Sequence, residues 1–176
     1  MMRGIDISNW QSGTNIPFTS VDFVICKATE GTGFVDAYCD GWVQKAKANG
    51  LCWGFYHFAG TGNAISEADW FIGNCEGYFY EGVPVLDWEG AQSVEWANDF
   101  VRRVHDMTGV WPWIYARPEY FNQGGVEANC ARWVAEWPNV TSPTFDMAQT
   151  WLPSETDGNV VAWQFCSDGY VAGCGP

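Results

Sequence analysis

The feature of this sequence that most constrains its fold is an alternation of short apolar runs with segments of helical periodicity. Helical patterns fall at residues 36–49, from residue 66 onward, and at residues 93–108. Such alternation predicts parallel βαβ units and therefore an α/β fold. The runs of strand length cover residues 4–8, 21–28, 52–58, 83–86, 111–115, 132–137, 146–151 and 160–165.

The length of the chain narrows this prediction. With 176 residues it is most simply one domain, residues 1–176, with a core of ordinary size. A complete eightfold β/α barrel takes about 250 residues, so several connections here must be loops rather than helices. We therefore predict an irregular TIM-like β/α barrel with fewer helices than strands, in which residues 119–130 form a short, broken helix or a loop.

Helix-capping residues support the helical segments. Either Asn63 or Ser66 can cap the second helix at its N-terminus, since both side chains accept hydrogen bonds from free backbone N–H groups. Gly50 and Gly109 follow the first and third helical segments, where glycine commonly ends a helix. These residues predict where the helices stop and where the polar loops begin.

Two carboxylates follow the strand at residues 83–86. Asp87 and Glu89 are separated by Trp88, and because side chains alternate along a strand, both should point to the same face. Their Cβ atoms should lie roughly 6–7 Å apart. Like charges at close range raise the pKa of one of them, so one group can donate a proton while the other stays ionised. The alternative is a solvated Asp-x-Glu pair that leads into a turn.

Other polar residues end the remaining predicted strands. In a β/α barrel the carboxyl ends of the strands form one rim, which is where active sites of this fold lie. We therefore expect residues distant in sequence to meet there. The residues concerned are Asp6, Glu30, Tyr56, His57, Asp87, Glu89, Tyr115 and Trp137.

Aromatic content and charge restrict the ligands of such a rim. Aromatic residues make up 17% of the chain and include 12 Trp, more than a core of this size usually needs. Aromatic faces suit both sugars and nucleic-acid bases. The formal net charge is −13 and no basic run is present, so we expect no binding of nucleic acid or of an anionic membrane surface. A glycan is the ligand class that remains.

From the histidines and cysteines we expect neither a metal site nor a cofactor. The two histidines lack ligand spacing, so no metal site and no cofactor are expected, and His57 is expected to be structural. The seven cysteines are irregularly spaced and include no C-x-x-C, which predicts mostly buried thiols. A Cys166–Cys174 bridge is the alternative for the last loop. No apolar stretch approaches 18 residues, and the N-terminus has no apolar signal-peptide core.

Short motifs along nearly the whole chain, in order, resemble those of glycoside hydrolase family 25, the lysozymes (N-acetylmuramidases) of phages, bacteria and some fungi. Each motif is weakly specific alone, and the ordered set is highly specific. The matching segments are residues 4–11 (GIDISNWQ), 27–31 (KATEG), 54–58 (GFYHF), 67–71 (EADWF), 86–89 (LDWE), 113–115 (WIY), 133–137 (WVAEW) and 163–165 (WQF).

The resemblance implies hydrolysis of the β-1,4 bond between N-acetylmuramic acid and N-acetylglucosamine in peptidoglycan. It implies that Glu89 is the general acid. It also implies that Asp87 and Asp6 hold or polarise the 2-acetamido group of the substrate, which can itself attack the anomeric carbon. Tyr56 and Tyr115 correspond to tyrosines of the binding groove.

Three further residues keep two interpretations each. Glu30 is either a groove residue or a brace of its loop. Trp10 and Trp137 are either sugar platforms or core residues, whereas Trp113 is expected in the core. We predict that Tyr56, Tyr115, Glu30 and Trp137 bind the substrate.

Members of the resembled family carry a V-D-x-N segment after the loop seen here at residues 167–173, and its Asp belongs to their active site. This sequence ends at Gly175-Pro176, where that segment would begin, and Asp168 lies in a Ser-Asp-Gly turn. The alternatives are therefore a non-catalytic glycan-binding module of the same fold, or a transglycosidase or chitinase-like hydrolase. We expect a monomer that acts on the bacterial wall, as a phage endolysin held in the host cytoplasm or by non-classical secretion.

Overall fold

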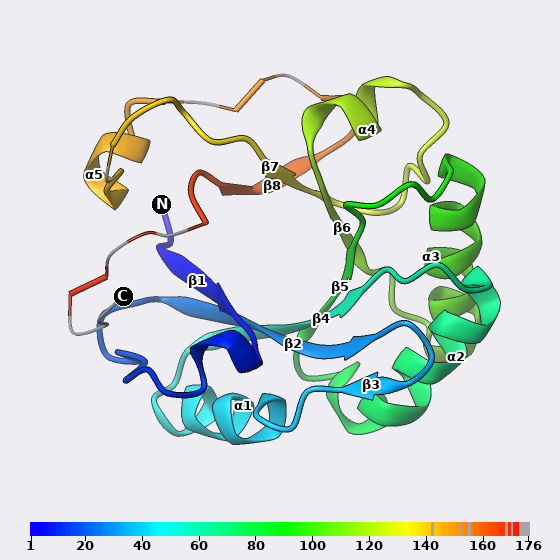
Figure 1. Cartoon of the computed structure of the whole chain (residues 1–176), viewed down its shortest axis with the longest axis horizontal. Helices are drawn as coiled ribbons and strands as arrows, with labels where there is room; N and C mark the ends of the chain where they lie inside the picture. Colours follow the sequence, from blue (N-terminus) through cyan, green and yellow to red (C-terminus); the bar gives the residue numbers. More distant parts are fainter. Residues whose placement is uncertain (142, 152, 155, 168, 170, 173–176) are drawn as a thin grey trace.

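The chain folds into a strongly curled sheet whose outer side is covered by helices (Figure 1). The computed structural model describes residues 1–141, 143–151, 153–154, 156–167, 169 and 171–172. The strands are β1 (Gly4–Ile7), β2 (Phe23–Glu30), β3 (Phe34–Val35), β4 (Cys52–Phe58), β5 (Val83–Asp87), β6 (Trp113–Ala116), β7 (Arg132–Ala135) and β8 (Val160–Gln164).

Five α-helices connect these eight strands within the described residues, which confirms an irregular TIM-like barrel with fewer helices than strands. Short 3-10 turns follow β1 (η1, Asn9–Gln11) and α2 (η2, Glu76–Tyr78). The helices are α1 (Cys39–Ala48), α2 (Ala64–Cys75), α3 (Val94–Thr108), α4 (Pro118–Asn122) and α5 (Phe145–Ala148).

The strands follow the order β1-β2-β4-β5-β6-β7-β8, and every neighbouring pair on this path is parallel. β3 adds to β2 as a short antiparallel strand. Among the described residues no backbone ladder joins β8 to β1, so the sheet curls without closing fully. Since the strands are parallel, their carboxyl ends share one rim.

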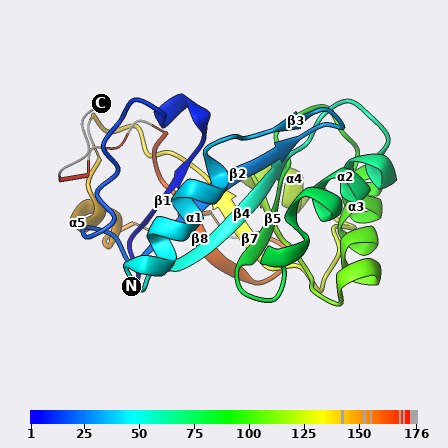
Figure 2. The same cartoon turned by 90° about the horizontal axis from the view of Figure 1, so that it is seen from below.

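The two faces of the sheet carry separate apolar clusters. On the concave side, Ile25, Val85, Tyr115, Trp133 and Ala135 pack together at alternate strand positions. On the convex side, the intervening positions pack under α1, α2 and α3, as the view from below shows (Figure 2). Both faces of the sheet therefore carry apolar clusters, and the carboxylates Glu30 and Asp87 stand at the carboxyl ends of their strands.

Local capping positions the helices as the sequence predicts. Asn63, rather than Ser66, caps α2, and its side chain accepts from the N–H groups of Ile65 and Ser66. The Ser93 hydroxyl accepts from the Trp96 N–H at the start of α3. Gly109 ends that helix with φ +74°, a backbone conformation that glycine adopts without strain.

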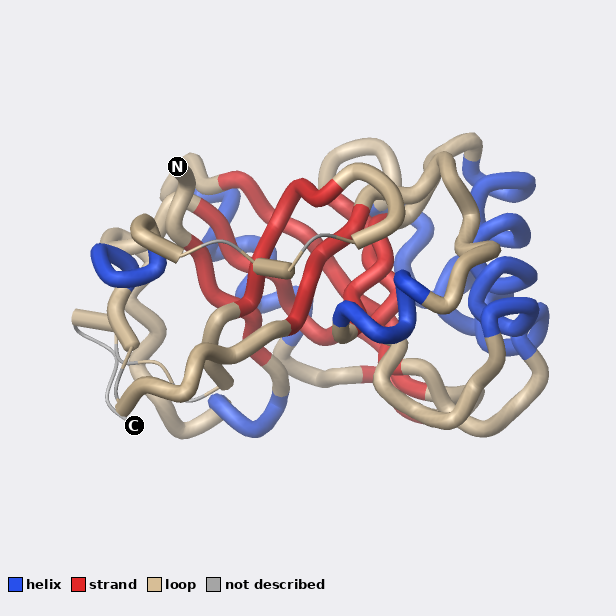
Figure 3. The backbone as a smooth tube through the Cα atoms, turned by 90° about the horizontal axis from the view of Figure 1, so that it is seen from above, coloured by secondary structure: helices blue, strands red, loops and turns tan. Residues whose placement is uncertain are grey.

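Residues 146–151 are not a strand, so that prediction is wrong. Phe145–Ala148 forms the short helix α5, seen at the edge of the sheet in the view from above (Figure 3). The Thr144 hydroxyl accepts from the Met147 N–H and caps the turn, and Asp146 lies in its first turn. An N-cap therefore outweighed the strand-like apolar pattern.

A short hairpin was also missed, because the stretch at residues 29–33 reads as a polar loop. Instead β2 continues to Glu30, the chain turns at Gly31 with φ +52°, and Phe34–Val35 pairs back onto Thr29 and Glu30. The hairpin places Glu30 at the end of β2, on the rim.

Four of the cysteines, Cys26, Cys39, Cys75 and Cys130, are buried as predicted, whereas Cys52 is exposed. Cys174, the partner in the alternative Cys166–Cys174 bridge, and Asp168 lie outside the described residues. Within the part of the chain that the structure describes, no helix is long and apolar enough to cross a membrane. The same residues contain no cluster of three metal-ligating side chains.

Candidate active site

The three predicted carboxylates meet at the carboxyl ends of β1 and β5. Asp6 lies in β1 and is partly buried, and Asp87 is the last residue of β5 and is 8% exposed. Glu89, two residues later, is exposed to solvent. Trp88 points to the opposite face, where it is fully buried and donates to the Gln92 carbonyl. The expected same-face arrangement of Asp87 and Glu89 follows from this alternation.

The carboxylates perturb one another. Burial raises the pKa of Asp87 well above its ordinary value, and the charge of Glu89, a hydrogen bond with Glu89 and the charge of Asp6 raise it further. Burial also raises the pKa of Asp6; a hydrogen bond from Gln164 opposes the rise and the charge of Glu89 adds to it. In the described part of the chain, Asp87 Oδ1 is buried without a hydrogen-bond partner. A protonated Asp87 fits this environment better than an ionised one.

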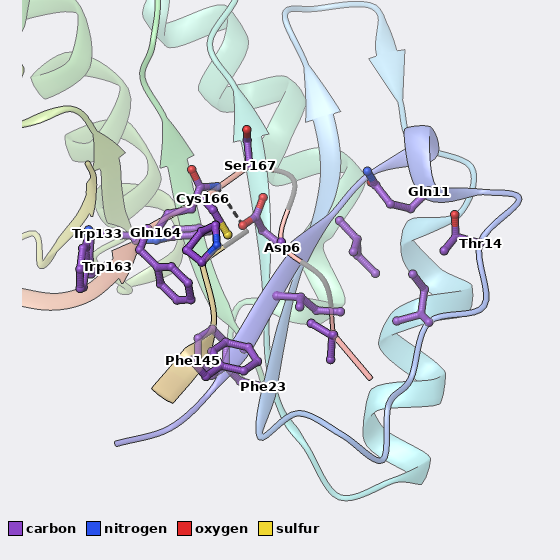
Figure 4. Close-up of a pocket in the computed structure, with 18 of the residues that line it drawn as sticks. Asp6, Gln11, Thr14, Phe23, Trp133, Phe145, Trp163, Gln164, Cys166 and Ser167 are labelled. Atoms are coloured by element: carbon purple, nitrogen blue, oxygen red, sulfur yellow. Dashed lines mark hydrogen bonds between the residues drawn. The ribbon is translucent and has the colours of Figure 1, made fainter. Parts of the chain in front are cut away.

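Gln164, at the end of β8, connects four parts of the rim. Its Oε1 accepts from the Tyr115 hydroxyl at 2.7 Å and from Trp137 Nε1 at 3.0 Å. Its Nε2 donates to Asp6 Oδ2 at 2.9 Å, the contact drawn as a dashed line in Figure 4. One amide therefore joins β1, β6, β8 and the segment after β7.

Both predicted groove tyrosines lie beside the carboxylates. Burial raises the pKa of Tyr56, and the charges of Asp87 and Asp6 raise it further, while the Ser8 side chain hydrogen-bonds its hydroxyl. Burial and the charges of Glu89, Asp87 and Asp6 raise the pKa of Tyr115. Both phenols therefore stay protonated at neutral pH, and the proton of Tyr115 is donated to Gln164 Oε1.

Glu30 reaches the rim through a lysine. Its Oε2 lies 2.6 Å from Lys27 Nζ, and that ammonium group lies 5.2 Å from the Phe34 ring centroid and 4.8 Å from that of Phe58. The positive charge of Lys27 lowers the pKa of Asp87, against the larger effect of burial. Glu30 is thus a partner of Lys27 next to the site, and its contact with substrate stays a prediction.

His57 does not join the carboxylates. It is fully buried on the convex side, with Nδ1 at 2.8 Å from the Thr29 hydroxyl and Nε2 at 3.1 Å from Glu67 Oε2. A bulge between Lys27 and Thr29 in β2 turns Thr29 toward His57 while Lys27 stays beside Tyr56. The expectation of a structural histidine agrees with these contacts.

The two undecided tryptophans are exposed. Trp10 is 84% exposed in η1, directly after β1, and Trp137 is 54% exposed after β7. Trp113 packs against the concave cluster, as expected for a core residue. The rim therefore carries indole faces that solvent reaches.

A cavity of about 410 Å³ opens along the seam between β1 and β8 (Figure 4). Asp6, Gln164 and Trp133 line its polar end, and Phe145 and Trp163 line its apolar part. A second, mostly apolar cavity of about 640 Å³ lies toward the amino ends of the strands, among Trp53, Trp113 and Trp151. Only the first one reaches a predicted site residue, Asp6.

Sequence reasoning missed Gln164, Lys27 and Ser8 as members of the site. A search for acid and base groups passes over an amide and a hydroxyl, and Lys27 sits within a strand pattern that reads as buried. The position of Gln164 at the end of the last strand was the available indication, since every strand end contributes to the rim.

Known proteins resemble this chain over nearly its whole length. The model for glycosyl hydrolases family 25 matches residues 5–174. Lysozyme M1 of Streptomyces globisporus is 30% identical, over 98% of this chain and 64% of its own length. The N,O-diacetylmuramidase of Chalaropsis sp is 28% identical, over 98% of this chain and 90% of its own. The chain thus spans just under two thirds of the first of these relatives.

A solved structure supports the same assignment. The bacterial lysozyme from Streptomyces coelicolor superposes with a TM-score of 0.78 at 28% identity, over 98% of this chain and 87% of that one. The curled parallel sheet with its carboxylate rim, together with the family match over residues 5–174, leads to one conclusion. The chain belongs to glycosyl hydrolase family 25.

Proposed function

We propose that this chain is a lysozyme that hydrolyses the β-1,4 bond between N-acetylmuramic acid and N-acetylglucosamine in bacterial peptidoglycan. The family and the names of its relatives, a lysozyme and an N,O-diacetylmuramidase, support the reaction class. The observation that carries the proposal is the hydrogen-bonded pair of a buried Asp87 with raised pKa and an exposed Glu89 at the strand ends.

The pair supplies the proton. Two carboxyl groups in contact bind one proton more tightly than either binds it alone, because ionising both would place like charges side by side. Glu89 faces solvent and can reach a glycosidic oxygen, whereas Asp87 cannot. Glu89 therefore donates the proton to the leaving oxygen as the C1–O bond breaks.

Asp6 and Asp87 assist at the sugar that develops positive charge. Asp6 accepts a hydrogen bond from Gln164, which favours its ionised form and lets it face an oxocarbenium-like centre. Once the shared proton has left through Glu89, the ionised Asp87 can accept a hydrogen bond from the N–H of the 2-acetamido group, whose oxygen attacks C1. Water then opens the resulting ring intermediate and returns a proton to the pair. Substrate assistance of this kind needs no carboxylate nucleophile.

The surrounding side chains suit a glycan. Tyr56 and Tyr115 present protonated phenols beside the carboxylates, and Trp137 and Trp10 expose indole faces on which a sugar ring can lie. Glu30 and Lys27 form the edge of the site on the β2 side. The net charge of −13 disfavours binding of nucleic acid. A monomer is sufficient for activity, because every proposed residue comes from one chain.

The test measures chemistry and binding separately. Purified cell walls are incubated with the protein, and both the loss of turbidity and the release of new reducing ends are followed. New reducing ends that disappear in Glu89→Gln support a lysozyme. Binding of soluble peptidoglycan fragments without new reducing ends would instead identify a non-catalytic glycan-binding module, and cleavage of chitin oligomers alone would identify a chitinase-like enzyme.

A further inference from the structure

The amide of Gln164 has its orientation fixed by its neighbours. The Trp137 indole N–H can only donate, so the atom facing it at 3.0 Å must be the Gln164 oxygen. The same oxygen also accepts a hydrogen bond from the Tyr115 hydroxyl, with 2.7 Å between the two oxygen atoms. The NH₂ group must then face Asp6 Oδ2, at 2.9 Å. A flipped amide would set NH₂ against N–H and oxygen against carboxylate, so it is excluded.

In this orientation the Gln164 amide gives Asp6 and Asp87 different hydrogen-bonding environments. Asp6 receives an N–H donor, which opposes the rise of its pKa, whereas Asp87 Oδ1 has no partner in the described part of the chain. Neighbouring carboxyl groups whose environments favour opposite protonation states can take opposite roles. Gln164 therefore favours the ionised form of Asp6, against the rise that burial causes in its pKa, and it provides no such donor to Asp87.

The same amide also bridges the seam of the sheet. No backbone ladder links β8 to β1 among the described residues, and a cavity opens between them. At the rim end of that cavity the Gln164–Asp6 hydrogen bond spans the two edge strands (Figure 4). Backbone ladders hold β1 to β2 and β8 to β7, so this hydrogen bond adds a direct side-chain link between Asp6 and the opposite edge of the sheet.

We propose that Gln164 is a positioning residue of the active site: its amide orients Asp6, Tyr115 and Trp137 through three hydrogen bonds and donates to the Asp6 carboxyl group, without touching the reacting atoms. The proposal rests on the proposed function for its kinetic consequences. Its structural part, the hydrogen bond that favours ionised Asp6, stands independently of which glycan is cleaved.

Gln164→Leu and Gln164→Glu test the proposal, with Gln44→Leu and Gln44→Glu on the exposed face of α1 as matched controls. Gln164→Leu should lower kcat on cell-wall fragments by about 10- to 100-fold, the scale of one lost hydrogen bond to a charged group. KM should change little. The acidic limb of the pH–rate profile should move to higher pH, because Asp6 loses its donor.

Gln164→Glu should affect activity differently at low and at high pH. When protonated, the introduced carboxyl can still donate to Asp6 and accept from Tyr115 and Trp137, so activity should be largely retained at low pH. When ionised, it repels Asp6, so activity should fall as pH rises. The Gln44 variants should follow the wild-type profile throughout.

A measurement without substrate separates this proposal from the lysozyme assignment. Carboxyl ¹³C titration by NMR, with the Asp6 signal assigned from Asp6→Asn, should show a higher Asp6 pKa in Gln164→Leu than in the wild type. An unchanged Asp6 pKa, or a kcat loss with an unmoved pH profile in a folded variant, overturns the positioning role. Wild-type protein that cleaves no wall material while the Asp6 shift is present overturns only the proposed function.

Discussion

Asp87 and Glu89 hydrogen-bond to each other at the end of β5, while Trp88 between them is fully buried on the other side of the sheet. Two acidic side chains make such a contact stably when one of them carries a proton. The strand geometry places both carboxyls on one face, and burial raises the pKa of Asp87. Four predictions follow from the structure.

Glu89→Gln should abolish cell-wall hydrolysis, by about 10²- to 10⁴-fold, because an amide cannot donate the proton that the leaving oxygen needs. Binding of peptidoglycan fragments should persist, since the side chain keeps its shape. Turbidity loss and reducing-end release measure the first effect, and fragment titration measures the second. Glu76→Gln, at an exposed glutamate after α2, is the matched control. Near-wild-type turnover in Glu89→Gln would remove Glu89 from the proposed mechanism.

Asp87→Asn should stabilise the fold at neutral pH and inactivate the enzyme. The pKa of Asp87 is raised in the folded state, so the folded protein binds a proton more tightly than the unfolded chain does. Its contribution to stability is therefore greatest below the ordinary Asp pKa, and it declines as pH rises toward the folded pKa. Replacing this ionisable group with an amide removes the cost of the raised pKa and should raise stability at pH 7 by on the order of 1 kcal/mol, or roughly 2–4 °C in Tm.

Thermal unfolding of wild type and Asp87→Asn at pH 4 and pH 7 checks this sign. The two proteins should differ less at pH 4, where the unfolded wild-type carboxyl is already about half protonated. A variant that is less stable than the wild type at both pH values would contradict the assignment of a destabilising buried carboxylate.

Glu67→Gln should destabilise the protein at neutral pH, where Glu67 is ionised in the wild type. Burial disfavours the charge of Glu67, but hydrogen bonds from His57 and from the Gly60 and Gly62 N–H groups outweigh it and lower its pKa. The stabilisation is thus present above the ordinary Glu pKa and is lost as pH falls through the folded pKa. We expect a loss of about 2 kcal/mol at pH 7, since an amide offers one acceptor where three donors converge.

Urea unfolding between pH 3 and pH 7 measures this contribution. The wild-type curve should fall on acidification, and the Glu67→Gln curve should be flatter and lower at neutral pH. Glu76→Gln again provides the control, and should leave the wild-type pH dependence in place. Equal slopes for Glu67→Gln and wild type would rule out an ionised Glu67 in the fold.

Trp10→Ala should weaken glycan binding and leave stability unchanged. Trp10 is 84% exposed directly after β1, so its removal costs the fold little packing, whereas stacking with a sugar ring is worth about 1 kcal/mol. KM for wall fragments should rise roughly 3- to 10-fold with kcat nearly constant. Tyr80→Ala tests whether any exposed aromatic matters, because Tyr80 is 79% exposed and precedes β5 at the amino ends of the strands. A similar KM change in both variants would argue against a specific platform.

The local patterns of the sequence were sufficient for most of the fold. Apolar runs located β1, β2, β4, β5, β6, β7 and β8 to within a few residues. The prediction is most direct for β2 and β5, because a strand buried on both faces must be largely apolar. The apolar runs failed at residues 145–148, where the Thr144 cap favours a helical turn, and at Phe34–Val35, which is a strand only because β2 offers it an edge. Pairing partners are not local, so such a short strand has no sequence pattern of its own.

The candidate site divides in the same way. Period-two alternation alone determined that Asp87 and Glu89 share a face, and the ordered strand ends determined that Asp6, Tyr56 and Tyr115 gather near them. Tertiary structure alone decided the burial that raises the pKa of Asp87, the pairing of Glu30 with Lys27 and the hydrogen bond from Gln164 to Asp6, 158 positions away. The physical reason is that side-chain direction follows from the backbone of a single strand, whereas burial and hydrogen-bond partners depend on how the curled sheet brings distant strands together.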